Sequence, residues 1–93
     1  MRFMANSRLA EGVSREQLVQ YVADHEIESS TWDLVRHHTV TEYVFKVGAS
    51  PGIVLFLEAD SNTAAQEIVN ALPVTERGLL AFDIDPVRAV AHF

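Results

Sequence analysis

The sequence predicts an α+β protein built in the order strand, helix, strand, strand, helix, strand. Residues 39–47 and 53–57 are strand-like and are joined by a Ser-Pro-Gly turn, a helical segment lies on each side of this pair, and short strand-like segments occur at 2–8 and 79–85. This order is that of a ferredoxin-like βαββαβ domain, in which an antiparallel four-stranded sheet carries two helices on one face. No linker or repeat divides the chain, so we expect a single domain over residues 1–93.

The first helix has a well-marked start but an uncertain course. Ser14 is suited to the N-cap and Gln17, three residues later, completes a capping box. At 100° per residue the helix has two apolar faces, one with Leu18, Tyr21, Val22, His25, Ser29 and Trp32, the other with Val19, Ala23, Ile27 and Leu34. Residues 28–31 are poor helix formers and Thr31 can cap a new segment, so we expect a break in this stretch.

The central hairpin and the last strand predict a sheet that is covered on both faces. In residues 50–52, Pro51 suits the first central position of a type II turn and Gly52 the second, where φ is positive. The run 53–57 is continuously apolar, and residues 79–84 place apolar side chains on both faces. Because both helices occupy one face, we expect a second copy of the chain to cover the other, in a face-to-face homodimer.

The second helix lies between these two strands. Ser61 or Asp60 caps its start and Pro73 ends it. Its inner stripe consists of Ala64, Ala65, Ile68, Ala71 and Leu72. The strand that follows is predicted to be closed by Pro86.

Composition excludes several classes of function. The chain has 7 Lys and Arg against 13 Asp and Glu, a net charge of −6, which argues against nucleic acid or an anionic membrane as partner. The absence of cysteine excludes a thiol nucleophile and a cysteine-bound zinc site. No apolar run has the length of a signal peptide core or a membrane span, so we expect a cytoplasmic protein. The charges are spread along the chain and mark no site.

Several segments together resemble a known family. A strand ending in Asp-Ser at 60–61, a helix ending in Leu-Pro at 72–73 and the run Phe-Asp-Ile-Asp-Pro-Val at 82–87 are similar to the muconolactone delta-isomerase-like branch of the dimeric α+β barrel superfamily. A looser likeness extends through residues 32–34, 40–45 and the N-terminal segment. The resemblance implies a homodimer or a ring of dimers, no metal or cofactor, and a pocket for a small organic acid or lactone-like ligand.

Three residues are candidates for chemistry. His25 lies in the first apolar stripe of the helix, where an imidazole can exchange a proton near neutral pH; the alternative is a buried histidine held by a hydrogen bond. Arg36 lies on the same face only if the helix is unbroken, and otherwise pairs with Glu42 or stays at the surface. Tyr43 and Glu42 alternate along a strand, so only one faces the cavity; Tyr43 can polarise a carbonyl or serve as a core or interface aromatic.

Other polar residues have simpler explanations. Asp83 and Asp85 share one strand face, which is typical of charges that protect a sheet edge and only secondarily of an acid–base pair. His37 and His38 are adjacent, so they diverge on a helix and do not predict a metal site. No glycine-rich nucleotide loop and no GxSxG motif occurs.

The function that these residues predict is a metal-free, cofactor-independent isomerase acting by proton transfer on a lactone or a related small organic acid. His25 is the expected general base or acid, with Tyr43 and Arg36 holding the carbonyl or carboxylate. Two alternatives stay open, a non-catalytic ligand-binding or assembly protein and a cofactor-independent monooxygenase or cyclase.

Overall fold

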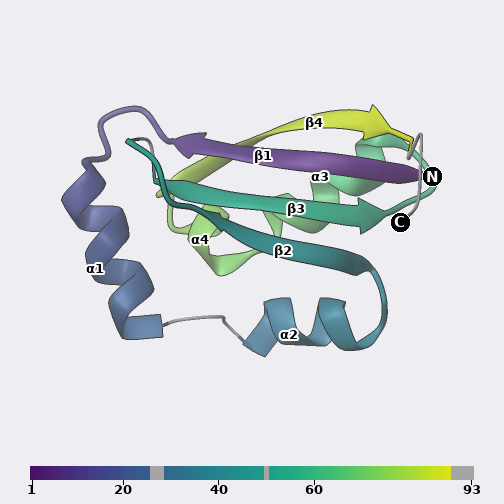
Figure 1. Ribbon diagram of the computed structural model, residues 1–93, viewed down its shortest axis with the longest axis horizontal. Coiled ribbons are helices and arrows are strands. Elements are labelled where there is room, and N and C mark those ends of the chain that lie inside the picture. The colour runs from purple at the N-terminus through teal and green to yellow at the C-terminus, as the bar shows by residue number, and fades with distance from the viewer. Residues whose placement is uncertain (26–28, 50, 89–93) are drawn as a thin grey trace.

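A four-stranded antiparallel sheet forms the centre of the protein (Figure 1). The computed structural model describes residues 1–25, 29–49 and 51–88, without the side chains of 25, 29 and 30. The strands are β1 (Arg2–Leu9), β2 (Val40–Lys46), β3 (Gly52–Glu58) and β4 (Leu80–Val87), in the spatial order β2-β3-β1-β4. All three strand pairings are antiparallel, and this order confirms the predicted ferredoxin-like α+β fold.

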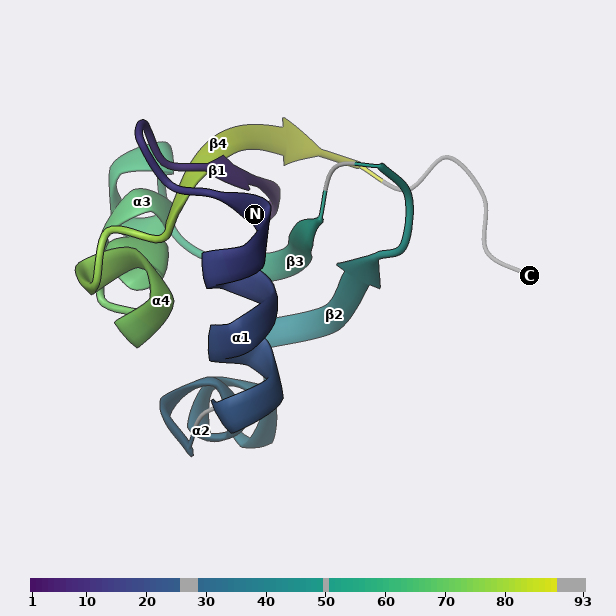
Figure 2. The same ribbon diagram turned by 90° about the vertical axis from the view of Figure 1, so that its left-hand side faces the viewer.

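Four helical segments accompany the sheet, where the sequence predicted two helices with a break in the first. They are α1 (Arg15–His25), α2 (Ser29–Arg36), α3 (Asn62–Asn70) and the single turn α4 (Pro73–Glu76). α3 and α4 lie behind the sheet in Figure 1, α1 stands at one end of the strands, and α2 runs beside β2. Figure 2 shows that α1 and α2 run in different directions, so the predicted first helix is two helices.

The core lies between the helices and one face of the sheet. Because side chains alternate along a strand, every second residue of β1 and β3 faces this core, and Phe3, Ala5, Leu55 and Leu57 are almost completely buried there. The helices contribute Leu18, Ala65, Val69 and Val74, and Leu72, the residue before α4, joins them. Burying a side chain of leucine or phenylalanine size contributes about 1.5–3 kcal/mol, so this face holds most of the apolar stabilisation.

The opposite face of the sheet carries no helix in the described part of the chain. The register brings Met4 of β1 opposite Phe56 of β3, and Val54 of β3 opposite Val44 of β2. Met4, Val54 and Phe56 are half-buried, and Val44 is 38% exposed. We call these four residues the open face; charged side chains of Arg2, Arg8, Glu42, Glu58, Asp83 and Asp85 surround them.

The predicted helix starts are confirmed at the level of individual hydrogen bonds. The Gln17 amide N–H donates to Ser14 Oγ at 3.2 Å, and the Ser14 amide N–H donates to Gln17 Oε1 at 2.7 Å, which is a complete capping box. At α3 the cap is Ser61, whose Oγ accepts from the Ala64 amide at 3.1 Å. Both helices therefore begin where the sequence placed them.

Two predictions about proline and glycine are wrong. Gly52 was expected to have a positive φ, but positive φ values among the described residues occur only at Gly12, Gly78 and His38. Gly52 instead begins β3, where it is needed for a close approach described below. Pro86 was expected to close the last strand but lies inside β4, which tolerates it because an edge strand needs no N–H on its outer side.

Candidate functional site: two cavities that share Lys46

A largely apolar cavity of about 270 Å³ lies among α1, α4, β2 and the beginning of β3. We call it the apolar cavity. It is lined by Leu18, Val19, Tyr21, Val22, Thr31, Tyr43, Phe45, Lys46, Pro51, Gly52, Ile53, Leu72, Val74 and Leu80. A mostly apolar wall with a few polar groups is the usual character of a small-molecule site.

Four side chains bring polar atoms to this cavity: Tyr21, Thr31, Tyr43 and Lys46. The Tyr43 ring meets the Phe45 ring edge-on, with centroids 5.4 Å apart and planes at 80°. The Arg77 guanidinium lies over the Tyr21 ring, 5.4 Å from its centroid, an attractive cation–π arrangement. Both tyrosine rings are therefore held in place by neighbours.

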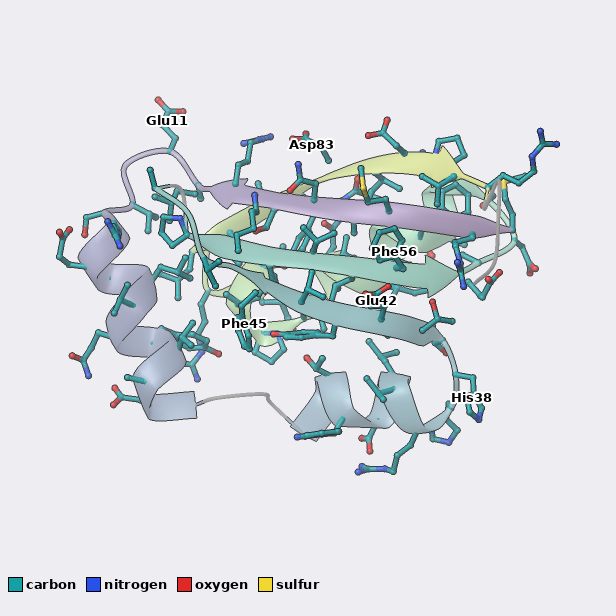
Figure 3. The ribbon with its side chains drawn as sticks, viewed as in Figure 1. Glu11, His38, Glu42, Phe45, Phe56 and Asp83 are labelled. Carbon is teal, nitrogen blue, oxygen red and sulfur yellow. The ribbon has the colours of Figure 1, made fainter. Side chains whose placement is uncertain are left out.

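A bulge in β2 decides which of its residues face the cavity. The pairing of β2 with β3 shifts between Val40 and Glu42, and then places Tyr43 opposite Leu55 and Phe45 opposite Ile53. Tyr43 and Phe45 thus line the cavity, whereas Glu42 is exposed (Figure 3). Of the two candidates that alternate here, the structure places Tyr43 at the cavity; its chemical role stays a prediction.

The position of His25 is described only through its backbone. His25 is the last residue of α1, and its side chain lies outside the described part of the structure. Three members of its predicted stripe, Leu18, Tyr21 and Val22, do line the apolar cavity. On a helix, His25 follows Tyr21 at i+4 and Val22 at i+3, the spacing of side chains that share a face. Its role in proton transfer stays a prediction.

Arg36 does not share that face. It was placed there on the condition that one unbroken helix runs from Leu18 to Arg36, and α1 and α2 are separate helices. Its guanidinium is exposed and pairs with the Asp33 carboxylate one turn earlier in α2. Arg36 lines neither of the two cavities described here, and its partner is Asp33 rather than Glu42. The surface alternative is therefore the arrangement found.

A hydrogen-bonded junction at one end of the sheet was missed from the sequence. Ser7 Oγ, almost completely buried, accepts from the Ile53 amide N–H at 2.8 Å, so the Ser7 side chain continues the contact between β1 and β3 beyond their last backbone pair. The Ser7 carbonyl accepts from Lys46 Nζ at 2.5 Å. A Cβ at Gly52 would lie 2.4 Å from Ser7 Oγ and 3.1 Å from Lys46 Cε, so only glycine fits between them.

A second cavity, of about 430 Å³, also has Lys46 in its lining. We call it the basic cavity. It is lined by Asn6, Ser7, Arg8, Leu9, Arg15, Lys46, Ala49, Pro51 and Asp83. Lys46 and Pro51 line both cavities, so the two cavities are neighbours. One weak signal for this site is present in the sequence, because Lys46 is the single lysine of the chain.

The remaining polar candidates have structural roles. Asp83 and Asp85 are exposed on the edge strand β4, and Asp83 pairs with Arg8 at 3.4 Å. His37 Nδ1 lies 2.7 Å from the Asp33 carbonyl oxygen, which fixes its ring to α2. Among the residues whose side chains the structure describes, no three His, Asp or Glu side chains gather closely enough to hold a metal ion. Nor does any described helix have the length and apolar character needed to cross a membrane.

Comparisons with known proteins support the fold. No family model matches the chain, and no curated protein sequence matches it. Among solved structures, the chain is similar to 5-chloro-2-hydroxyhydroquinone dehydrochlorinase from Burkholderia phenoliruptrix AC1100, whose structure is a complex with 2,5-dihydroxybenzoquinone. The TM-score is 0.65 at 19% sequence identity, over 95% of this chain and 94% of the other. At this identity the likeness concerns architecture alone, and it agrees with the ferredoxin-like α+β fold of this chain.

Proposed function

We propose that this protein binds a small, largely apolar organic compound in the apolar cavity and catalyses a proton transfer on it. The observation that carries the proposal is the cavity itself, whose wall is apolar except for two tyrosines, one threonine and one lysine. Such a wall desolvates a small compound, and the few polar groups orient it. The dehydrochlorinase of similar fold, crystallised with a dihydroxybenzoquinone, makes a small cyclic compound a reasonable class of ligand.

The proposed reaction is an isomerisation of a lactone or a related small organic acid. A base removes a proton from a carbon next to a carbonyl group. The protonated base then returns a proton to another carbon, so that the double bond changes position and the composition of the compound stays the same. We assign the base to His25, because its position at the end of α1 continues the stripe Leu18, Tyr21 and Val22. We assign to Tyr43, which lines the same cavity, a hydrogen bond to the carbonyl oxygen, where negative charge develops. Arg36 has no part in this proposal.

Deuterium exchange tests the reaction before the natural substrate is known. Unsaturated five-membered lactones are incubated with the protein in D₂O, and carbon-bound deuterium is followed by NMR. We expect His25→Ala to slow the exchange by about two to four orders of magnitude. His37→Ala is the matched control, because the His37 imidazole contacts a backbone carbonyl oxygen of α2 and His37 lines neither cavity. Equal exchange rates in the His25 and His37 variants would remove His25 from the mechanism.

Non-catalytic binding is the second candidate function, and the predominance of apolar groups in the wall favours it. The two candidates share one prediction, that an uncharged aromatic compound such as benzyl alcohol binds in the apolar cavity. Val22→Phe fills part of the cavity and should weaken this binding at least about tenfold, whereas Val47→Phe, at a position 97% exposed, should not. Binding of benzyl alcohol without deuterium exchange on any lactone would favour the non-catalytic function.

We also propose that two copies of the chain associate through the open face. Met4, Val44, Val54 and Phe56 form an apolar centre, and charged residues of both signs surround it. An apolar centre with a polar rim is the usual composition of a protein interface. The second copy would bury the side chains of the open face that one copy leaves partly in contact with water.

A further inference from the structure

The basic residues of this acidic chain are unevenly distributed in space. The chain has seven Lys and Arg residues, and three of them, Arg8, Arg15 and Lys46, line the basic cavity. Asp83 is the one carboxylate among the lining residues. The cavity is therefore net positive in a protein whose net charge is −6.

The cations of this cavity keep most of their hydrogen-bonding capacity. Arg8 pairs with Asp83 through Nε at 3.4 Å, which leaves the outer nitrogens of its guanidinium. Lys46 Nζ donates one of its three N–H groups to the Ser7 carbonyl. Within residues 1–25, 29–49 and 51–88, neither Arg15 nor Lys46 takes part in an ion pair. Three neighbouring cations repel one another, and an anion between them relieves this repulsion.

The attachment of Lys46 gives the cavity a fixed element. Its acceptor is a backbone carbonyl of β1, next to the buried Ser7 side chain that binds the start of β3. The ammonium group is therefore positioned by the sheet before any ligand arrives. Preorganised charge of this kind loses little conformational entropy when it binds.

We propose that the basic cavity binds the anionic group, a carboxylate or a phosphate, of a small organic compound. Lys46 and Pro51 belong to the walls of both cavities, so one compound can place its apolar part against one side of Lys46 and its anionic group against the other. In this respect the inference rests on the proposed function, which puts the apolar part of the ligand in the apolar cavity. The anion site takes the role that the sequence assigned to Arg36.

The test compares four probes by titration of the ¹⁵N-labelled protein at low ionic strength: sodium acetate, inorganic phosphate, benzoate and uncharged benzyl alcohol. Arg15→Gln and Lys46→Gln should each raise the dissociation constant of benzoate, and of acetate or phosphate, about tenfold. Arg88→Gln is the matched control, since it removes the same charge from an exposed residue that lines neither cavity. Added sodium chloride should weaken the binding of the anions but not the binding of benzyl alcohol.

The pattern of results separates this inference from the proposed function. A response of acetate alone identifies a carboxylate site, and a response of phosphate alone identifies a phosphate site. If Arg15→Gln and Lys46→Gln raise the dissociation constant of no anion more than Arg88→Gln does, the anion site is refuted. This holds even where benzyl alcohol still binds and Val22→Phe weakens its binding. If benzyl alcohol does not bind while the anions respond to Arg15→Gln, the anion site stands and the proposed function fails. Because Lys46→Gln also removes a hydrogen bond to β1, Arg15→Gln keeps the test independent of folding.

Discussion

Gly52→Ala is expected to destabilise the protein strongly, although it adds one methyl group. The new Cβ would lie 2.4 Å from Ser7 Oγ, about 1 Å inside ordinary van der Waals contact, and 3.1 Å from Lys46 Cε. Ser7 Oγ is the acceptor for the buried Ile53 amide, so its displacement leaves that N–H without a partner. An unsatisfied buried donor costs about 1–3 kcal/mol and crowding of a packed interior a similar amount. We expect the free energy of unfolding to fall by about 2–4 kcal/mol.

Urea unfolding followed by far-UV circular dichroism, at one fixed protein concentration, measures this change. Gly48→Ala is the matched control, because a Cβ there meets nothing within 4 Å and should change the stability by less than about 0.5 kcal/mol. The double variant Ser7→Ala/Gly52→Ala removes the oxygen that causes the clash. It should therefore be more stable than the sum of the single variants predicts, by at least about 1 kcal/mol. The proposed clash is refuted if Gly52→Ala lowers the free energy of unfolding no more than Gly48→Ala does. It is also refuted if Gly52→Ala lowers the free energy of unfolding equally in the presence of Ser7 and in the Ser7→Ala variant.

Three further predictions concern helix ends and assembly. Ser14→Ala removes the acceptor of the Gln17 amide and should lower the free energy of unfolding by about 1 kcal/mol in thermal or urea melts; no change would show that the capping box contributes nothing. His38 has φ 60°, a left-handed conformation that is costly for any residue but glycine. His38→Gly removes this cost but adds the larger conformational entropy that glycine loses on folding, so the free energy of unfolding should rise by about 0.5–1 kcal/mol. A decrease would contradict this expectation. Sedimentation equilibrium at micromolar concentration should give a mass of at least twice the chain mass of 10.4 kDa. Phe56→Glu should lower the measured mass toward that of a single chain. If the protein without substitutions is already a monomer, the open-face dimer is refuted.

Local signals predicted the fold well because each depends on a few neighbouring residues. The capping box at Ser14 and the cap at Ser61 are formed as expected, since the bonds involved span three residues. The continuously apolar run 53–57 predicted a strand covered on both faces, and the strand places Leu55 and Leu57 in the core. The order of strands followed from these elements and from the topology that they allow.

The errors arose where distant residues decide the conformation. Gly52 was assigned to a turn because its neighbours in sequence suggest one, yet the constraint comes from Ser7, 45 positions away, whose Oγ lies close to it. Arg36 was placed near the cavity only on the condition of one unbroken helix, and the chain forms two helices in this stretch. The basic cavity combines residues 6–9, 15, 46, 49, 51 and 83, and no sequence window contains them together. Positively charged residues that are far apart in the sequence are brought to one cavity by folding.

The attachment of Lys46 to a main-chain oxygen makes its position independent of most sequence change. Every residue type at position 7 supplies a carbonyl, so no substitution there deletes the acceptor. Side-chain anchors, such as Asp33 for Arg36, are lost by a single mutation. The lysine shared by the two cavities can thus keep its position while the residues of the surrounding walls change.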